Sequence, residues 1–152
     1  MEAAGKTSGD GVPEAIERVL RRFRAMSRAD KMQALVQYSQ KLEPVPERYD
    51  EVDRSSFTIP ECQTRVDIFP EVHQGKMHFY ADVNVRQSPT VAAVLAVIFA
   101  AVNEQPPAVT LAIPRDFVRM LMDGMGLHAR EAGLNAMVAR LKRAAEGASV
   151  AS

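Results

Sequence analysis

The sequence predicts an α+β domain in which helices pack against a small antiparallel sheet of two to three strands. Apolar residues recur at helical spacing towards both ends of the chain, whereas the middle alternates apolar and polar residues around a tight turn. Helices, then a hairpin, then helices is an order typical of α+β domains. The chain has 152 residues, enough for one domain with a hydrophobic core. We expect this domain at residues 13–146, between a disordered lead-in (1–12) and a frayed tail (147–152).

Two helices are expected first. Pro13 suits the first turn of a helix. The apolar residues of this helix follow at spacings of three and four: Ile16, Val19, Leu20 and Phe23. Ser27 and Asp30 resemble a capping box that opens the second helix, and Pro44 stops it. Its expected apolar face is Met32, Leu35, Val36 and Leu42. A polar loop over residues 47–56 follows.

An antiparallel hairpin is expected next. Residues 64–69 and 77–83 flank the turn His73-Gln74-Gly75. In the second strand every other residue is apolar, which predicts one face in the core and one in water. These apolar residues are Met77, Phe79, Ala81 and Val83. A further short strand is expected over residues 57–59, before Pro60.

The remaining helices follow the hairpin. Ser88-Pro89 is a good helix start, and residues 91–102 are apolar on every side, which indicates a helix buried between a sheet and other helices. This run is too short for the ~20 residues that cross a bilayer. Pro106-Pro107 ends the element. Pro114 opens a short helix that Gly124 closes.

The last helix has Leu134, Met137, Val138 and Leu141 at core spacing. Arg140, Lys142 and Arg143 are expected late in this helix, where cations suit the helix dipole.

Charge and cysteine content exclude several classes of protein. Acidic and basic residues balance at 19 each, so no strong field would attract nucleic acid or anionic lipid. We therefore expect neither nucleic acid nor membrane as a partner. The chain has one cysteine and no secretory apolar segment, which favours a reducing compartment, most simply the cytosol.

Cys62 is the candidate for chemistry. A single thiol forms no internal disulfide, so it would act as a lone nucleophile or sulfur carrier, or else as a small buried hydrophobe. Pro60 takes the chain out of regular pairing just before Cys62, and the adjacent residues are polar. Arg65 would favour the thiolate and Glu61 would oppose it, so the sign of the pKa shift stays open. These residues alone also leave the reactive and structural roles open.

Three segments together resemble the SufE family of sulfur acceptors in iron–sulfur cluster assembly, over about residues 23–145. Residues 32–46, MQALVQYSQKLEPVP, look like the family's second helix with its proline stop. Pro60-Glu61-Cys62-Gln63-Thr64 is similar to the family's cysteine loop, in the form with glutamate before the cysteine. Residues 127–137, LHAREAGLNAM, resemble the family's L-x-P-x-R-x-x-G-L-x-x-M segment.

The resemblance implies a SufE/IscU-like fold and a mechanism. A pyridoxal-phosphate cysteine desulfurase would carry a persulfide, and Cys62 would take its outer sulfur and deliver it to an iron–sulfur scaffold. The pyridoxal phosphate belongs to the desulfurase, so this chain is expected to need no cofactor and not to be a self-sufficient enzyme. The expected partner-binding residues are Glu61, Gln63, Thr64, Arg65, Arg130 and Gly133.

The sequence departs from the family pattern at several positions. Asp67 stands where a tryptophan or another bulky residue is usual, and residues 82–85 replace an acidic-serine-acidic turn. Ala92-Ala93 replaces an Arg-Gly pair, and Ala129 follows His128 where proline is common. These changes leave room for a paralogue that docks a different desulfurase.

Three other functions are consistent with parts of the sequence. A metal-binding scaffold would need three or four soft ligands, for which the chain offers Cys62, His73, His78 and His128. We expect these histidines to be surface residues and no metal to be bound. A docking activator of a desulfurase would not use the thiol at all. A cysteine enzyme acting alone would need a base and an oxyanion site, which the sequence does not offer.

Overall fold

The computed structural model describes residues 13–62, 64–123, 125 and 128–151. The first two helices, α1 (Glu14–Arg24) and α2 (Arg28–Ser39), precede two 3₁₀ turns, η2 (Glu47–Tyr49) and η3 (Arg54–Ser56). The hairpin of β1 (Val66–His73) and β2 (Lys76–Val83) follows. The chain then forms α3 (Pro89–Val102), α4 (Pro107–Leu111), α5 (Phe117–Leu121) and α6 (His128–Ala151). The predicted lead-in lies outside the described residues.

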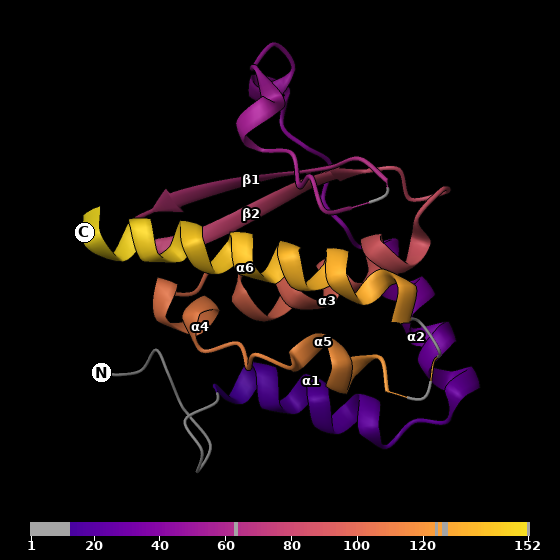
Figure 1. Ribbon diagram of the computed structural model, residues 1–152. Coiled ribbons are helices and arrows are strands. Elements are labelled where there is room, and N and C mark those ends of the chain that lie inside the picture. Colours follow the sequence, from indigo (N-terminus) through magenta and orange to yellow (C-terminus); the bar gives the residue numbers. More distant parts are fainter. Residues whose placement is uncertain (1–12, 63, 124, 126–127, 152) are drawn as a thin grey trace.

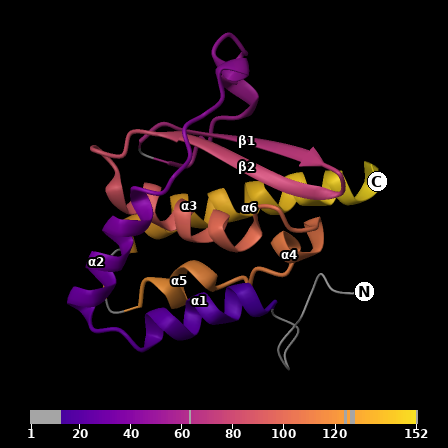
Figure 2. The ribbon, with the colours of Figure 1, turned by 180° about the vertical axis from the view of Figure 1, so that it is seen from behind.

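The fold is the predicted α+β arrangement of helices on a small antiparallel sheet. The hairpin lies over α3 and α6, and α1 and α5 lie on the other side of these two helices (Figures 1 and 2). Val66 pairs with Val83 and His73 with Lys76. Both turn residues, Gln74 and Gly75, have positive φ, as a two-residue hairpin turn requires. The predicted strand at 57–59 is reduced to one bridge between Thr58 and Asp67.

The sheet is covered on both faces, which explains the unbroken burial of residues 66–69. Met77, Phe79 and Ala81 of β2 are buried in the helical core, as their alternation predicts. On the other face, the segment with η2 and η3 packs onto β1, seen above the sheet in Figure 1. There, the rings of Tyr49 and Phe69 stack with centroids 4.3 Å apart. This second cover positions the residues that enter the loop around Cys62.

The apolar face predicted for α2 is right for Leu35 and Leu42 and wrong for Met32 and Val36. Leu35 is buried, but Met32 and Val36 are 46% and 51% exposed. Lys31 is buried in their place, and its Nζ donates to the backbone carbonyl of Asp123 at 2.8 Å. A lysine stem can cover apolar surface while its ammonium group finds a polar partner, so the buried stripe of α2 is rotated from the expected one.

The last helix is longer than the sequence suggests. α6 runs to Ala151, through most of the tail that was expected to fray, and Ala148 is 8% exposed because it continues the buried stripe of Leu141 and Ala145. Arg140, Lys142 and Arg143 therefore all lie before the last turn of α6, so the helix-dipole interpretation does not apply to them. The sequence does not predict α4, because the pair Pro106-Pro107 that begins it is equally typical of the end of an element.

Long apolar runs in this chain form core helices. Nearly every residue of α3 is buried, as predicted for a helix between a sheet and other helices. No helix within the described ranges has both the length and the apolar character needed to cross a membrane.

Candidate functional site

The cysteine loop, residues 59–65, leads into the amino end of β1 and meets α6 at Cys62. The Ile59 amide donates to the Val66 carbonyl at 2.9 Å, which closes the base of the loop. The Cys62 amide donates to the Ile59 carbonyl at 3.3 Å. Pro60 lacks an amide hydrogen, so the ladder begun at Ile59 does not continue along the loop. The sequence thus presents Cys62 on a turn at the sheet edge, as predicted.

The tip of the loop rests against α6. Cys62 is half-buried, and its thiol donates to the Gly133 carbonyl with Sγ and O 3.8 Å apart. A Cβ at position 133 would lie 3.2 Å from Sγ and 3.6 Å from the Glu61 carbonyl oxygen. Glycine is therefore the residue that allows the loop to approach this closely.

A cavity of about 140 Å³ adjoins the thiol. Its lining joins the loop to α3 and to the first turns of α6. The lining residues are Glu61, Cys62, Thr64, Val91, Arg130, Ala132, Gly133, Leu134 and Met137. The lining includes both charged and apolar side chains, so a sulfur atom there would be partly shielded from water.

The electrostatic surroundings of Cys62 favour the neutral thiol. Burial raises the pKa of Cys62, and the negative charge of Glu61 raises it further, while the positive charge of Arg130 lowers it. The net pKa shift is upward, because desolvation is the largest of these effects and disfavours the thiolate. In this conformation the thiol is held in its less nucleophilic form.

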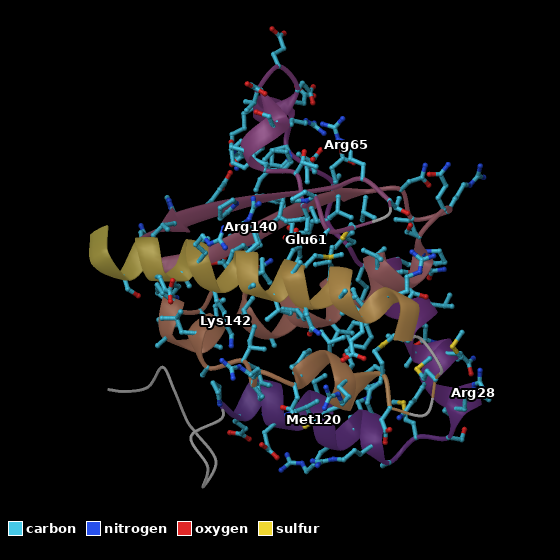
Figure 3. The ribbon with its side chains drawn as sticks, viewed as in Figure 1. Arg28, Glu61, Arg65, Met120, Arg140 and Lys142 are labelled. Carbon is cyan, nitrogen blue, oxygen red and sulfur yellow. The ribbon has the colours of Figure 1, made fainter. Side chains whose placement is uncertain are left out.

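Most of the sequence-predicted site residues come together, whereas Arg65 does not. Glu61, Thr64, Arg130 and Gly133 line the cavity beside Cys62. Arg65 instead turns to Asp67, with Nε 3.3 Å from Oδ2, and Figure 3 shows it near the η2–η3 segment while Glu61 lies beside α6. The cation that acts on the thiol is therefore Arg130 and not Arg65. Gln63 lies outside the described residues.

Sequence reasoning missed four apolar lining residues and one polar contact. The spacing of Val91, Leu134 and Met137 predicts core residues and does not separate core from cavity wall, and Ala132 has no predicted role. Arg140 donates from α6 to the carbonyls of Ser56 (2.9 Å) and Thr58 (3.3 Å), just before the cysteine loop. The available sequence signal was the position of Arg140, three residues after the core residue Met137 and so close to the buried face of the helix.

The histidines form no cluster with Cys62 in the part of the chain that the structure describes. No group of three or more His, Cys, Asp or Glu residues there could hold a metal ion. His78 instead contacts two carboxylates, with Nδ1 2.7 Å from Glu104 and Nε2 2.7 Å from Glu43. His73 is exposed, and the side chain of His128 is outside the described set.

Comparisons with known proteins find related chains and a similar fold. Uncharacterized SufE-like proteins from two Mycobacterium tuberculosis strains, CDC 1551 / Oshkosh and H37Rv, are each 28% identical to this chain over 145 residues, which cover 90% of this chain and 95% of theirs. The solution structure of a hypothetical protein from Thermus thermophilus superposes with a TM-score of 0.78 at 26% identity. The match covers 91% of this chain and 98% of that one.

The family model SufE, described as an Fe-S metabolism associated domain, matches residues 17–145. This match spans the cysteine loop, the hairpin and the cavity-lining part of α6. The chain belongs to the SufE family of Fe-S metabolism associated proteins.

Proposed function

We propose that this protein is a sulfur acceptor that takes sulfur from a cysteine desulfurase onto Cys62 and delivers it to an iron–sulfur cluster scaffold. The observation that carries the proposal is the lone thiol on a turn beside a cavity with both charged and apolar walls. A single thiol suits this role because a second cysteine nearby would resolve a persulfide into a disulfide. The thiol must stay reduced, which suits a reducing compartment such as the cytosol.

The transfer step needs no further oxidant. The Cys62 thiolate attacks the outer sulfur of the desulfurase persulfide, forming a new S–S bond as the old one breaks. The desulfurase cysteine leaves as a thiolate and takes up a proton. The raised pKa of Cys62 is consistent with a thiol that reacts slowly until a partner docks, since it limits the thiolate present at neutral pH.

The partner would dock over the cavity mouth. Glu61, Gln63, Thr64, Arg65, Arg130 and Gly133 remain the proposed partner-binding residues, with Arg130 also favouring the thiolate. Docking is expected to draw the cysteine loop away from α6. Limited proteolysis with and without desulfurase tests this, and unchanged cleavage around residues 61–65 would contradict it.

The deciding experiment mixes the protein with a cysteine desulfurase and free cysteine, beside Cys62→Ser, and records intact masses. We expect a reductant-sensitive gain of about one sulfur atom that is absent in Cys62→Ser. No adduct, but equal stimulation of the desulfurase by both proteins, would replace this proposal with a docking activator. Neither adduct nor stimulation would refute both.

A further inference from the structure

Asp67 is a buried carboxylate at the base of the cysteine loop. It lies on β1 and is only 1% exposed, although its strand neighbours Val66 and Ile68 are the residues that face the helical core. Burying a carboxylate is costly unless charge and hydrogen bonds compensate it. The side chains that contact Asp67 therefore indicate which part of the chain this buried carboxylate holds in place.

The partners of Asp67 come from both ends of the cysteine loop. The Thr58 hydroxyl donates to Oδ1, and Arg65 Nε lies 3.3 Å from Oδ2. Thr58 precedes Cys62 by four residues and Arg65 follows it by three. Arg54 of η3 adds a third contact, with Nη1 3.4 Å from Oδ2. We call these four residues, Arg54, Thr58, Arg65 and Asp67, the Asp67 clasp.

The clasp acts on the same segment that α6 holds from the other side. Arg140 binds the carbonyls of Ser56 and Thr58, and Gly133 contacts the thiol at the loop tip. The loop is therefore fixed at its base by Asp67 and Arg140 and rests at its tip on α6. Its base cannot shift without breaking contacts to a buried charge.

We propose that Asp67 is a positioning residue that holds both ends of the cysteine loop and thereby keeps the Cys62 thiol seated against Gly133. This inference rests on the proposed role of Cys62 and adds a residue that touches neither the thiol nor its cavity. The clasp also holds the Arg65 guanidinium against Asp67, so that Arg130 is the cation that acts on the thiol.

Alkylation of the thiol measures its seating directly, because Cys62 is the only cysteine in the chain. Rates with iodoacetamide are followed by intact mass from about pH 7 to pH 10, a range that brackets the ordinary thiol pKa. Asp67→Asn keeps the shape and removes the charge. Arg65→Gln and Thr58→Val each remove one contact and leave Asp67 in place, so the test remains available if Asp67→Asn does not fold.

Two control variants separate seating from general weakening. Asp30→Asn removes an exposed carboxylate in the first turn of α2, an element that contributes no residue to the clasp. Leu20→Ala truncates a core side chain of α1, on the far side of α3 and α6 from the loop (Figure 1). It destabilises the whole fold without touching the clasp.

We expect Asp67→Asn, Arg65→Gln and Thr58→Val to raise the alkylation rate about threefold or more. Each variant removes a contact that holds the cysteine loop, so the thiol is held less firmly against Gly133 and is more accessible. The midpoint of the pH profile should also move down, as the thiol leaves its partly buried site. The controls should stay within about 1.5-fold of the wild type. Unchanged rates and midpoints in the folded clasp variants, or an equal rise in Leu20→Ala, would overturn the proposal.

The clasp and the proposed function fail in different ways. If the wild type takes no sulfur from the desulfurase, the sulfur-acceptor role is lost, while the alkylation rates still decide whether Asp67 seats the thiol. If the clasp variants alkylate like the wild type, Asp67 has no positioning role, whatever Cys62 carries.

Discussion

At the scale of single residues, opposed charges surround the one thiol. Glu61 and Arg130 lie on the wall of the same cavity, and they shift the pKa of Cys62 in opposite directions. Burial adds to the effect of Glu61, so the thiol form prevails in the free protein. A partner that neutralised Glu61 would shift the balance towards the thiolate without moving any atom of Cys62.

Charge substitutions should move the thiol pKa in opposite directions. Arg130→Gln removes the positive charge that favours the thiolate, so we expect a higher pKa for Cys62, whereas Glu61→Gln should lower it. The pH dependence of the alkylation rate measures both. Arg143→Gln, an exposed arginine on the same helix, is the control and should leave the profile unchanged. Parallel shifts in all three variants would contradict this account.

Two glycines of α6 offer a matched pair. Gly147→Ala meets no atom within 4 Å, so we expect the usual gain of about 0.5–1 kcal/mol for alanine in a helix. Gly133→Ala places its Cβ 3.2 Å from Cys62 Sγ, so the loop must shift and that gain should be lost. Urea unfolding compares the two stabilities. Equal stabilisation by both substitutions would show that the cysteine loop can move away from residue 133 without a loss in the free energy of unfolding.

At the scale of elements, two stripes of α2 compete for the core. Met32 and Val36 are four residues apart on one stripe, and Lys31 and Leu35 are four apart on the next. Helical spacing fits both stripes, and hydrophobicity favours the stripe of Met32 and Val36. The stripe that is buried is nevertheless that of Lys31 and Leu35, with Lys31 bound to the Asp123 carbonyl. The choice depends on the Asp123 carbonyl, which is 92 residues away in sequence from Lys31 and invisible to a local pattern.

The two stripes of α2 should differ sharply in stability. Leu35→Ala truncates a side chain that is 4% exposed, so we expect a loss of about 2–4 kcal/mol in the free energy of unfolding. Met32→Ala changes a side chain that is 46% exposed, and should cost about 0.5 kcal/mol or less. Urea unfolding of both variants measures this difference. A cost of about 2 kcal/mol for Met32→Ala would restore the stripe that hydrophobicity predicts.

Elements with local signals were predictable, and those defined by distant contacts were not. Prolines and the Ser27 cap locate the starts of α1, α2, α3 and the region of α5, because helix entry is set by adjacent residues. The site followed from a resemblance that already contained Cys62 and Arg130. Asp67 could be noticed only as a departure, since its role depends on side chains from η3 and both ends of the loop.

At the scale of the whole molecule, His78 connects three parts of the chain. It lies on β2 between Glu43, which follows α2, and Glu104, which follows α3. Burial lowers the pKa of His78, but its hydrogen bonds to Glu104 and Glu43 and their charges raise it more, so the net shift is upward. The cross-strand neighbour Glu71 adds a further negative charge on this face.

Stability should therefore fall as pH rises past the His78 transition. The folded state binds this proton more tightly than the unfolded chain does. The stabilisation is thus complete below the ordinary pKa of 6.5 and is lost as pH rises through the higher folded-state value. The size should be about 1 kcal/mol or less, because Glu43 and Glu104 are exposed to solvent.

The measurement is the difference in free energy of unfolding between the wild type and His78→Gln, across that pH range. The difference should shrink with rising pH. A gap that is constant or widens with pH would contradict the assigned charge state of His78.

The contacts of α6 with the cysteine region also limit how the chain can change in length. Gly133 and Arg140 are seven residues apart, which is close to two helical turns, so both face the same segment. Inserting or deleting one residue between them would rotate Arg140 by about 100° relative to Gly133. The helix could then no longer bind the base of the cysteine loop through Arg140 and contact Cys62 through Gly133 at the same time. We therefore expect this stretch to tolerate substitutions at its exposed positions, Asn135 and Ala139, but no change in residue number.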